Sequence, residues 1–195
     1  MVSEFREHPA APNATLRLSP MKPLVFRLER VPAPCGDMLV ATDEQGSMRA
    51  LEWDGFEGRL HRYLRLRYGR DAVRIEPAAG ITGVRRSLQA YLDGDLHAID
   101  RIPVRADGTP FQRQVWAALR AIPAGTTVSY GTLAARIGRP SATRAVGMAN
   151  NANPIGVVVP CHRVIGADGS LTGYGGGLPR KRWLLEHEGV LLRED

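Results

Sequence analysis

The chain has 195 residues, 44% of them hydrophobic, and a formal net charge of +6. This length supports one large or two small domains, and no apolar run approaches the roughly 20 residues of a membrane-spanning helix. Residues 1–20 also lack the apolar segment of a secretory signal, so we expect a soluble, cytoplasmic protein that binds no membrane. The two cysteines, Cys35 and Cys161, lack the spacing of zinc or redox sites, and we expect reduced thiols rather than a disulfide.

The positive charge lies in the C-terminal half. Residues 1–108 contain 16 Lys/Arg and 15 Asp/Glu, whereas residues 109–195 contain 10 and 5, so the excess is +1 against +5. Between Thr109 and Leu185 the only acidic residue is Asp168. Codon usage could explain an arginine-rich composition, but the scarcity of acidic residues favours a surface that binds nucleic-acid phosphates.

The N-terminal half has the patterns of a small α/β domain. Residues 1–22 contain prolines without periodicity and are predicted to be a flexible tail. In residues 23–100, the runs "LVFRLERV", "MLVATDE" and "SMRALEW" predict a small antiparallel sheet. The segments "GRLHRYLRLRYG" and "ITGVRRSLQAYLDGD" then have helical spacing of apolar residues. Four basic residues of the first helix are predicted mostly on its solvated face: Arg59, Arg62, Arg65 and Arg67.

Residues 101–108 contain turn-forming residues and are predicted to link this domain to a C-terminal one, residues 109–195. The C-terminal domain begins with "TPFQRQVWAALRAIPAG", which has a Thr-Pro helix start and a Pro and Gly stop. Two short helices follow, the first from about Tyr130 to Ile137 and the second from an N-cap at Ser141 to about Ala149. Their short connection predicts a helix-turn-helix.

The second of these helices is rich in small residues, including Gly147, although glycine costs about 1 kcal/mol in a helix interior. A closely packed partner helix could explain them. Arg144 favours a different explanation, because small residues around one long cation suit a helix in a DNA groove. Its side chain would reach between or beside bases, or contact a phosphate.

The stretch "NPIGVVVPCHRVIG" allows two interpretations of Cys161. The apolar run predicts a buried strand, in which the thiol would be inert. Alternatively, His162 or Arg163 favours the thiolate, directly or through a water, and makes Cys161 a nucleophile. A histidine base also needs a carboxylate partner. The sequence leaves five candidates: Asp168, Glu186, Glu188, Glu194 and Asp195.

A glycine-rich segment, "GADGSLTGYGGGLP", follows this stretch and is predicted to be a pliable loop with Tyr174 as its aromatic residue. It lacks the glycine spacing of P-loops and of dinucleotide sites.

Four blocks together resemble the O6-alkylguanine-DNA alkyltransferases: "TPFQRQVWAALRAIPAGTTVSYGTLAARIG", "ATRAVGMANNANP", "VVPCHRVIG" and "GYGGGLPRKRWLLEHEG". They cover roughly residues 109–189, and the likeness over residues 24–108 is looser. The resemblance implies an α+β fold, with a small ribonuclease-H-like α/β N-terminal domain followed by a winged-helix-like, mainly helical C-terminal domain. It implies no cofactor and no metal, and a monomer.

The resemblance also implies roles for individual residues. Cys161 would accept the alkyl group, His162 would act as its base through a water, and Glu188 would orient the histidine. Asn153 would hold the turn before the cysteine, and Tyr130 would protonate the departing guanine or press on the target phosphate. Arg144 would replace the flipped nucleotide from the minor groove. Further DNA contacts would come from Ser141, Ala142, Thr143 and Tyr130. The substrate pocket would be lined by Val159, Tyr174, Gly175 and Gly176.

The expected function is therefore direct-reversal repair of O6-alkylguanine, and of O4-alkylthymine, in double-stranded DNA, with irreversible transfer to Cys161 after nucleotide flipping. Gly175 and Gly156 stand where some relatives carry larger residues, which predicts a pocket open to larger alkyl groups. The cysteines of a zinc-binding N-terminal region are absent, so a role as an adaptive-response activator is not expected. The alternatives are a damage sensor without turnover, a helix-turn-helix transcription regulator and a hydrolytic Cys–His enzyme.

Overall fold

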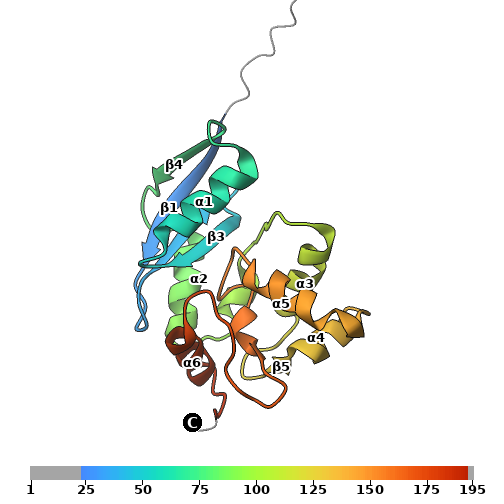
Figure 1. Cartoon of the computed structure of the whole chain (residues 1–195). Coiled ribbons are helices and arrows are strands. Elements are labelled where there is room, and N and C mark those ends of the chain that lie inside the picture. The colour runs from blue at the N-terminus through green and yellow to red at the C-terminus, as the bar shows by residue number, and fades with distance from the viewer. Residues whose placement is uncertain (1–22, 193–195) are drawn as a thin grey trace, which may run out of the picture.

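The computed structural model describes residues 23–192, so the predicted tail at residues 1–22 lies outside the described part. The fold is mixed α+β (Figure 1). In chain order, with η for 3₁₀ helices, its elements are β1 (Leu24–Val31), β2 (Met38–Thr42), β3 (Met48–Trp53), α1 (Glu57–Tyr68), β4 (Val73–Pro77), α2 (Gly83–Leu92), η1 (Ala98–Arg101), α3 (Pro110–Arg120), β5 (Val128–Ser129), α4 (Tyr130–Arg136), η2 (Pro140–Ala142), α5 (Thr143–Asn151), η3 (Cys161–Arg163), β6 (Val164–Ile165) and α6 (Leu178–His187).

The N-terminal sheet has the strand order β3-β2-β1-β4. The three predicted strands pair antiparallel, but β4 pairs parallel to β1, so the prediction of an antiparallel sheet was wrong and the sheet is mixed. The sequence "VRIEP" of β4 places only half-buried and exposed residues in the strand. It therefore lacks the apolar alternation that identified the other strands.

Apolar residues pack on both faces of this sheet. A small cluster that includes Phe26, Leu60 and Leu64 lies between the sheet and α1. The other face belongs to a larger core that is continuous from Val31 in β1 to Leu184 in α6. The two halves of the chain therefore share one hydrophobic core, which fixes them against each other.

The segment predicted as a linker lies against the sheet. Met48 donates its amide proton to the carbonyl of Pro103 over 2.8 Å, and Arg105 donates to the carbonyl of Met48 over 2.9 Å. The carboxylate of Asp107 accepts hydrogen bonds from Arg49 and from the hydroxyl of Tyr68, each at 2.5 Å. The connection between the halves is thus held by backbone and side-chain bonds.

The helix signals in the C-terminal half explain most of its element boundaries. Thr109 and Gln112 form a capping box at the start of α3, and Ser129 caps α4. The predicted cap at Ser141 was wrong. Ser141 lies inside η2, whose turn is closed by a bond from Ala142 to Arg139, and α5 begins at Thr143 without a side-chain cap.

The run before Cys161 is buried, as predicted, but the predicted strand was wrong. Val157 has a left-handed φ of 66°, and the amide of Val159 turns back to the carbonyl of Ile155 over 2.9 Å. The chain then enters η3 at Cys161. A short buried apolar run has the same composition whether it is extended or coiled into turns, so periodicity alone could not separate them.

Among residues 23–192 we find no helix with the length and apolar character needed to cross a bilayer. Nor do three or more His, Cys, Asp or Glu side chains of this described part gather in a way that could hold a metal ion.

Candidate active site

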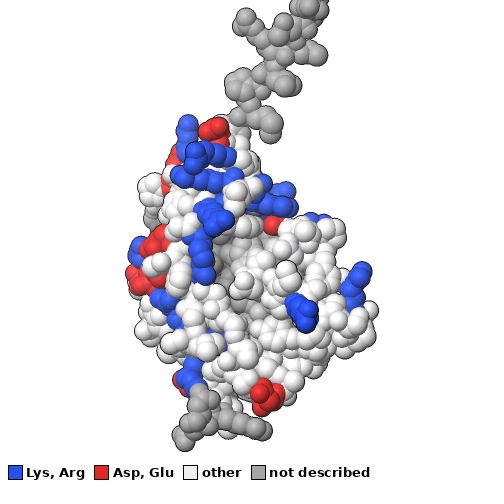
Figure 2. Space-filling model, in the orientation of Figure 1, with Lys and Arg blue, Asp and Glu red and all other residues white. Residues whose placement is uncertain are grey.

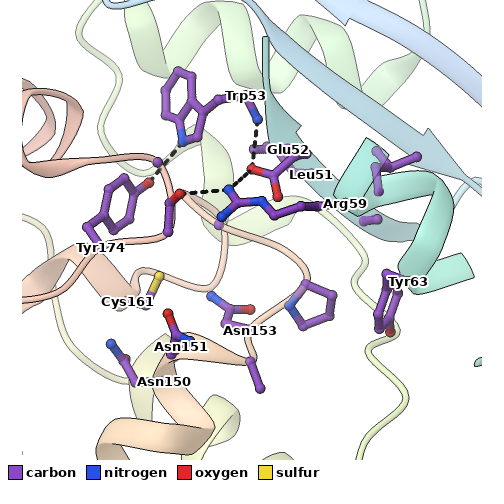
Figure 3. A pocket seen from close by; sticks show the side chains of 17 residues that line it. Leu51, Glu52, Trp53, Arg59, Tyr63, Asn150, Asn151, Asn153, Cys161 and Tyr174 are labelled. Atoms are coloured by element: carbon purple, nitrogen blue, oxygen red, sulfur yellow. Dashed lines mark hydrogen bonds and ion pairs between the residues drawn. The ribbon is translucent and has the colours of Figure 1, made fainter. Parts of the chain in front are cut away.

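Cys161 is the first residue of η3, and 7% of its surface is exposed. It faces a cavity of about 180 Å³ that is lined by both halves of the chain (Figure 3). Asn153, Tyr174, Gly175 and Gly176 line the same cavity. Four of the predicted site residues thus surround the thiol, although they lie up to 23 positions apart in the sequence.

Asn153 holds the turn that leads to the thiol. Its Nδ2 donates to the carbonyl of Val159 over 2.7 Å, and its Oδ1 accepts from the amide of Ile155 over 3.1 Å. The carbonyl of Val159 also accepts from the amide of Cys161 over 2.7 Å. The side chain of Val159 points elsewhere, to a separate surface cleft that Val104 and Trp116 also line, so it does not line the cavity around the thiol.

His162 is fully buried next to the cysteine. Its Nε2 lies 3.0 Å from Oε1 of Glu188, whereas its Nδ1 has no hydrogen-bond partner among the described residues. Burial lowers the pKa of His162, and the bond to Glu188 opposes that shift. The ring is therefore held by one nitrogen and leaves the other for a proton transfer.

Glu188, directly after α6, is the carboxylate behind the histidine. Besides His162, its oxygens accept from the hydroxyl of Tyr91 at 2.8 Å and from Arg163 at 2.8 and 2.9 Å. Burial alone would raise the pKa of Glu188, but the bonds from His162 and Arg163 outweigh it and hold the pKa well below its usual range. A carboxylate that is ionised at neutral pH therefore orients the imidazole.

The other predicted carboxylate candidates lie elsewhere. Glu186 is half exposed and pairs with Arg182 at 4.0 Å. Asp168 lies in an exposed turn and accepts from Ser170. Glu194 and Asp195 lie outside the described residues.

Lys181 is a site residue that the sequence reasoning missed. It is fully buried, and its Nζ donates to the carbonyls of Val164 and Thr172, each at 2.6 Å. Burial lowers the pKa of Lys181 to about 8. A detectable signal existed, because Lys181 shares helical spacing with the buried residues Leu184 and Leu185.

The environment of the thiol has opposing effects on its pKa. Burial raises the pKa of Cys161 above its ordinary value, while a hydrogen bond from Asn153 and the charge of Lys181 lower it. Burial prevails, so the thiol remains protonated at neutral pH unless a base removes the proton.

Tyr130, the first residue of α4, approaches the site from the helical side. Burial raises the pKa of its hydroxyl, and the negative charge of a Cys161 thiolate would raise it as well. Hydrogen bonds with Thr172 and Asn150 lower it. A Cβ added to Gly173 would lie 3.8 Å from this hydroxyl. Tyr130 therefore lies next to the glycine-rich segment, as a neutral donor at neutral pH.

The start of α5 lies on the surface. Ser141, Thr143 and Arg144 are exposed and Ala142 is half-buried. The buried residues Val146 and Ala149 belong to the core that α5 shares with α3 and α4.

Packing does not require all the small residues of α5. Ala145 is exposed, and a Cβ on Gly147 would meet the ring of Tyr130 at an ordinary 3.8 Å. In Figure 2 the helical half around the central hollow shows scattered basic groups and little acidic surface. This face is open and suited to a polyanion.

The N-terminal half supplies residues that were not predicted for the site. Glu52, Trp53 and Arg59 line the cavity, and Nε1 of Trp53 donates to the hydroxyl of Tyr174 over 3.2 Å. Arg59 was predicted on a solvated face and is 46% exposed at its side chain, but its guanidinium bonds to Glu52 and to the carbonyl of Gly175. Sequence spacing gave no signal for the contacts of Trp53 with Tyr174 and of Arg59 with Gly175, which join segments more than 100 residues apart.

Known proteins are similar to this chain over most of its length. Residues 110–190 match the DNA-binding domain of 6-O-methylguanine DNA methyltransferase. The chain is 50% identical to the methylated-DNA--protein-cysteine methyltransferase of Salmonella typhimurium over 84% of this chain and 96% of that protein. It is 41% identical to that of Methanosarcina acetivorans over 80% and 94% of the two chains.

Solved structures are similar too. The structure of Mycobacterium tuberculosis OGT in complex with DNA aligns with a TM-score of 0.66 and 39% identity, over 84% of this chain and 92% of that one. The O6-methylguanine-DNA methyltransferase of Pyrococcus kodakaraensis aligns with a TM-score of 0.64 and 26% identity, over 85% and 99%.

Proposed function

Because the chain belongs to the methylated-DNA–protein-cysteine methyltransferase family, we propose that Cys161 removes the alkyl group from O6-alkylguanine in double-stranded DNA. The observation that carries this proposal is the position of the thiol. Cys161 faces a cavity, next to a histidine whose imidazole is fixed by an ionised Glu188. The family supplies the reaction class, and the buried His162–Glu188 pair next to Cys161 supports the assignment of a nucleophile and its base.

Activation of the thiol begins at Nδ1 of His162. This nitrogen takes the proton of Cys161 through a bridging water, and the imidazolium that forms is stabilised by Glu188. Lys181 and Asn153 favour the thiolate as it appears. Sγ then attacks the alkyl carbon in line, the carbon–O6 bond breaks, and the electron pair leaves with the guanine.

Guanine leaves more easily if its developing negative charge receives a proton. We assign that donation to the hydroxyl of Tyr130, which lies beside the cavity. Tyr174, Gly175 and Gly176 form the wall against the base. The target atom is inaccessible in a base stack, so the nucleotide must flip into this cavity.

DNA is held by α4 and α5 in a helix-turn-helix that approaches the minor groove. Arg144 fills the position of the flipped nucleotide, and Ser141, Ala142, Thr143 and Tyr130 contact the strand around it. Exposure of Arg144 and the open small-residue face of α5 support this assignment. We extend the substrate class to O4-alkylthymine and take the active unit to be a monomer.

Intact-mass analysis after mixing with a duplex that carries O6-methylguanine tests the proposal. We expect one added methyl per protein, located at Cys161 by peptide analysis, and no further product after one equivalent, because a thioether does not hydrolyse readily. Cys161→Ala should gain no methyl, and Cys35→Ala should gain one. A wild-type protein without added mass, or with repeated turnover, would contradict the assignment, and duplexes with O4-methylthymine test the extension.

A further inference from the structure

One wall of the cavity around Cys161 comes from the N-terminal half. Glu52 and Trp53 lie at the end of β3, and Arg59 lies in the first turn of α1. Across the cavity from them runs the Tyr174–Gly176 segment. Figure 3 shows Arg59 extending from α1 over the cavity toward this segment.

The guanidinium of Arg59 joins the two walls. Its Nη2 donates to the carbonyl of Gly175 over 2.7 Å and to Oε1 of Glu52 over 2.8 Å. The same Oε1 accepts from the amide of Trp53 over 3.0 Å, and the guanidinium lies 4.2 Å from the ring centroid of Phe56. The carboxylate of Glu52 and the ring of Phe56 therefore orient the guanidinium toward the carbonyl of Gly175.

The segment that Arg59 holds is flanked by two glycines, and its far end is also held by Arg180, whose Nη1 donates to the carbonyl of Gly176 over 3.2 Å. Gly173 and Gly177, on either side of it, have positive φ angles of 40° and 90°. Within it, Gly176 packs so closely on Trp53 that an added Cβ would lie 2.5 Å from the indole. The carbonyl of Gly175 is fixed from the opposite wall by Arg59.

We propose that Arg59 is a positioning residue for alkyl transfer, which holds the Tyr174–Gly176 wall at the distance from Cys161 that in-line attack requires. This inference rests on the function proposed above and adds a specific part for the N-terminal half. A displacement of about 1 Å in a reacting geometry can cost about 100-fold in rate. The pair with Glu52 is partly exposed and adds little to folding, so the rate should respond more than stability does.

The test uses single-turnover transfer from an O6-methylguanine duplex, with protein in excess. We compare Arg59→Met with Arg62→Met, because Arg62 lies one turn further along α1, is exposed, and has no ion pair that we find among residues 23–192. Both variants lose one charge. Arg59→Met should lower the maximal rate constant about tenfold or more, while its half-saturating concentration stays within about twofold of that of Arg62→Met. Arg59→Lys should recover part of the rate.

A second readout separates positioning from effects on the thiol. The pH profile of Cys161 alkylation by iodoacetamide, followed by peptide mass, should be the same in Arg59→Met and wild type. The inference is overturned if Arg59→Met transfers methyl as fast as Arg62→Met. It is also overturned if the pH profile shifts enough to account for the loss, or if the loss follows a fall in Tm that Arg59→Lys shares. A wild-type protein that does not methylate Cys161 would instead refute the proposed function.

Discussion

Glu188 connects the side chains of two consecutive residues of η3 to one from α2. Tyr91 comes from α2, whereas His162 and Arg163 belong to η3, and all of them donate to one carboxylate with no exposed surface. Ionic groups buried in this way stabilise a fold only while each has its partner. The carboxylate therefore orients the imidazole of His162 and also holds η3 in place.

Replacing this carboxylate by an amide should affect activity and stability. In Glu188→Gln, Arg163 becomes a buried charge without a counter-ion, so we expect the free energy of unfolding to fall by about 3–5 kcal/mol. Methyl transfer should also slow, because His162 loses the charge that stabilises its protonated form. Denaturant titration and single-turnover transfer measure the two effects. The control is Glu186→Gln, whose half-exposed side chain should change stability by less than about 0.5 kcal/mol.

Lys181 offers a separate test of the electrostatics at the thiol. In Lys181→Met the positive charge that favours the thiolate is gone, so the pKa of Cys161 should rise further. The rate of iodoacetamide alkylation at Cys161 should then increase with pH over a higher range than in wild type. Arg182→Met removes a charge from the neighbouring position on α6 and should leave this profile unchanged.

At the scale of elements, α5 has two different faces. Val146 and Ala149 are buried, while Arg144 and Ala145 are exposed at its start. The sequence left two explanations for its small residues, namely close packing against another helix or close approach of DNA. A Cβ at Gly147 would meet Tyr130 at an ordinary contact distance of 3.8 Å, so packing does not demand a glycine there, which favours the second explanation.

Arg144→Ala tests the part played by this face. We propose that this side chain fills the flipped nucleotide's position, so without it flipping should cost more, and repair of duplex DNA should slow by about 10- to 100-fold. Reaction with a free O6-alkylguanine base needs no flipping and should keep its wild-type rate. Arg136→Ala on α4 provides a matched loss of one exposed arginine. Equal losses on duplex and free base would rule out the flipping role.

Two glycines that line the cavity around Cys161, Gly156 and Gly175, are the basis of a prediction about the size of the alkyl group. Cβ atoms added at Gly156 and Gly175 would find their nearest neighbours at 3.7 and 3.8 Å, namely Tyr174 and Arg59, so each position accepts a Cβ at ordinary contact distance. We expect the wild type to transfer benzyl as well as methyl groups from guanine in oligonucleotides. Gly156→Val should slow benzyl transfer more than methyl transfer. Brisk methyl transfer with negligible benzyl transfer by wild type would contradict a roomy pocket.

The sequence predicted helix boundaries correctly where the signal lies in a few neighbouring residues. The Thr-Pro start of α3 and the glycine after α4 marked real boundaries, because caps depend on a few neighbouring residues. The turns at Val157 could not be found, since burial on all sides removes periodicity. The bond from Arg59 to the carbonyl of Gly175 could not be found either, because only the folded chain brings the two near, whereas the helical spacing of Lys181 with Leu184 and Leu185 was a signal that was overlooked.

At the scale of the whole molecule, the two halves are joined by a common core and by hydrogen bonds to the half-buried carboxylate of Asp107 and the buried carboxylate of Glu188. Asp107 binds Arg49 and Tyr68 of the N-terminal half, and Glu188 binds Tyr91 of α2. The sequence predicted the two parts and the chemical site in the second. It did not predict that the first part closes the pocket, because that depends on how the parts dock.

These carboxylates predict how stability depends on pH. Burial would raise the pKa of Asp107, but Tyr68 and Arg49 lower it overall, and the pKa of Glu188 is lowered as well. Their stabilisation is therefore complete above the ordinary carboxyl range, near pH 5, and is lost as the pH falls through the lower pKa values of the folded state. Denaturant titrations from pH 7 to pH 3 should show this decline. Glu188→Gln should make it shallower, whereas Glu186→Gln should not.

The burial of Cys161 also affects how long the protein keeps a reactive thiol before it meets damaged DNA. A protein that reacts once cannot replace a thiol lost to a passing oxidant or electrophile, so every accidental reaction would permanently reduce the cell's capacity for repair. Only 7% of the residue is exposed and its thiol stays protonated, which makes it a poor target for such reagents. In the proposed mechanism the thiol reacts with a base that enters the cavity, so molecules that have not yet met damaged DNA keep a thiol able to react.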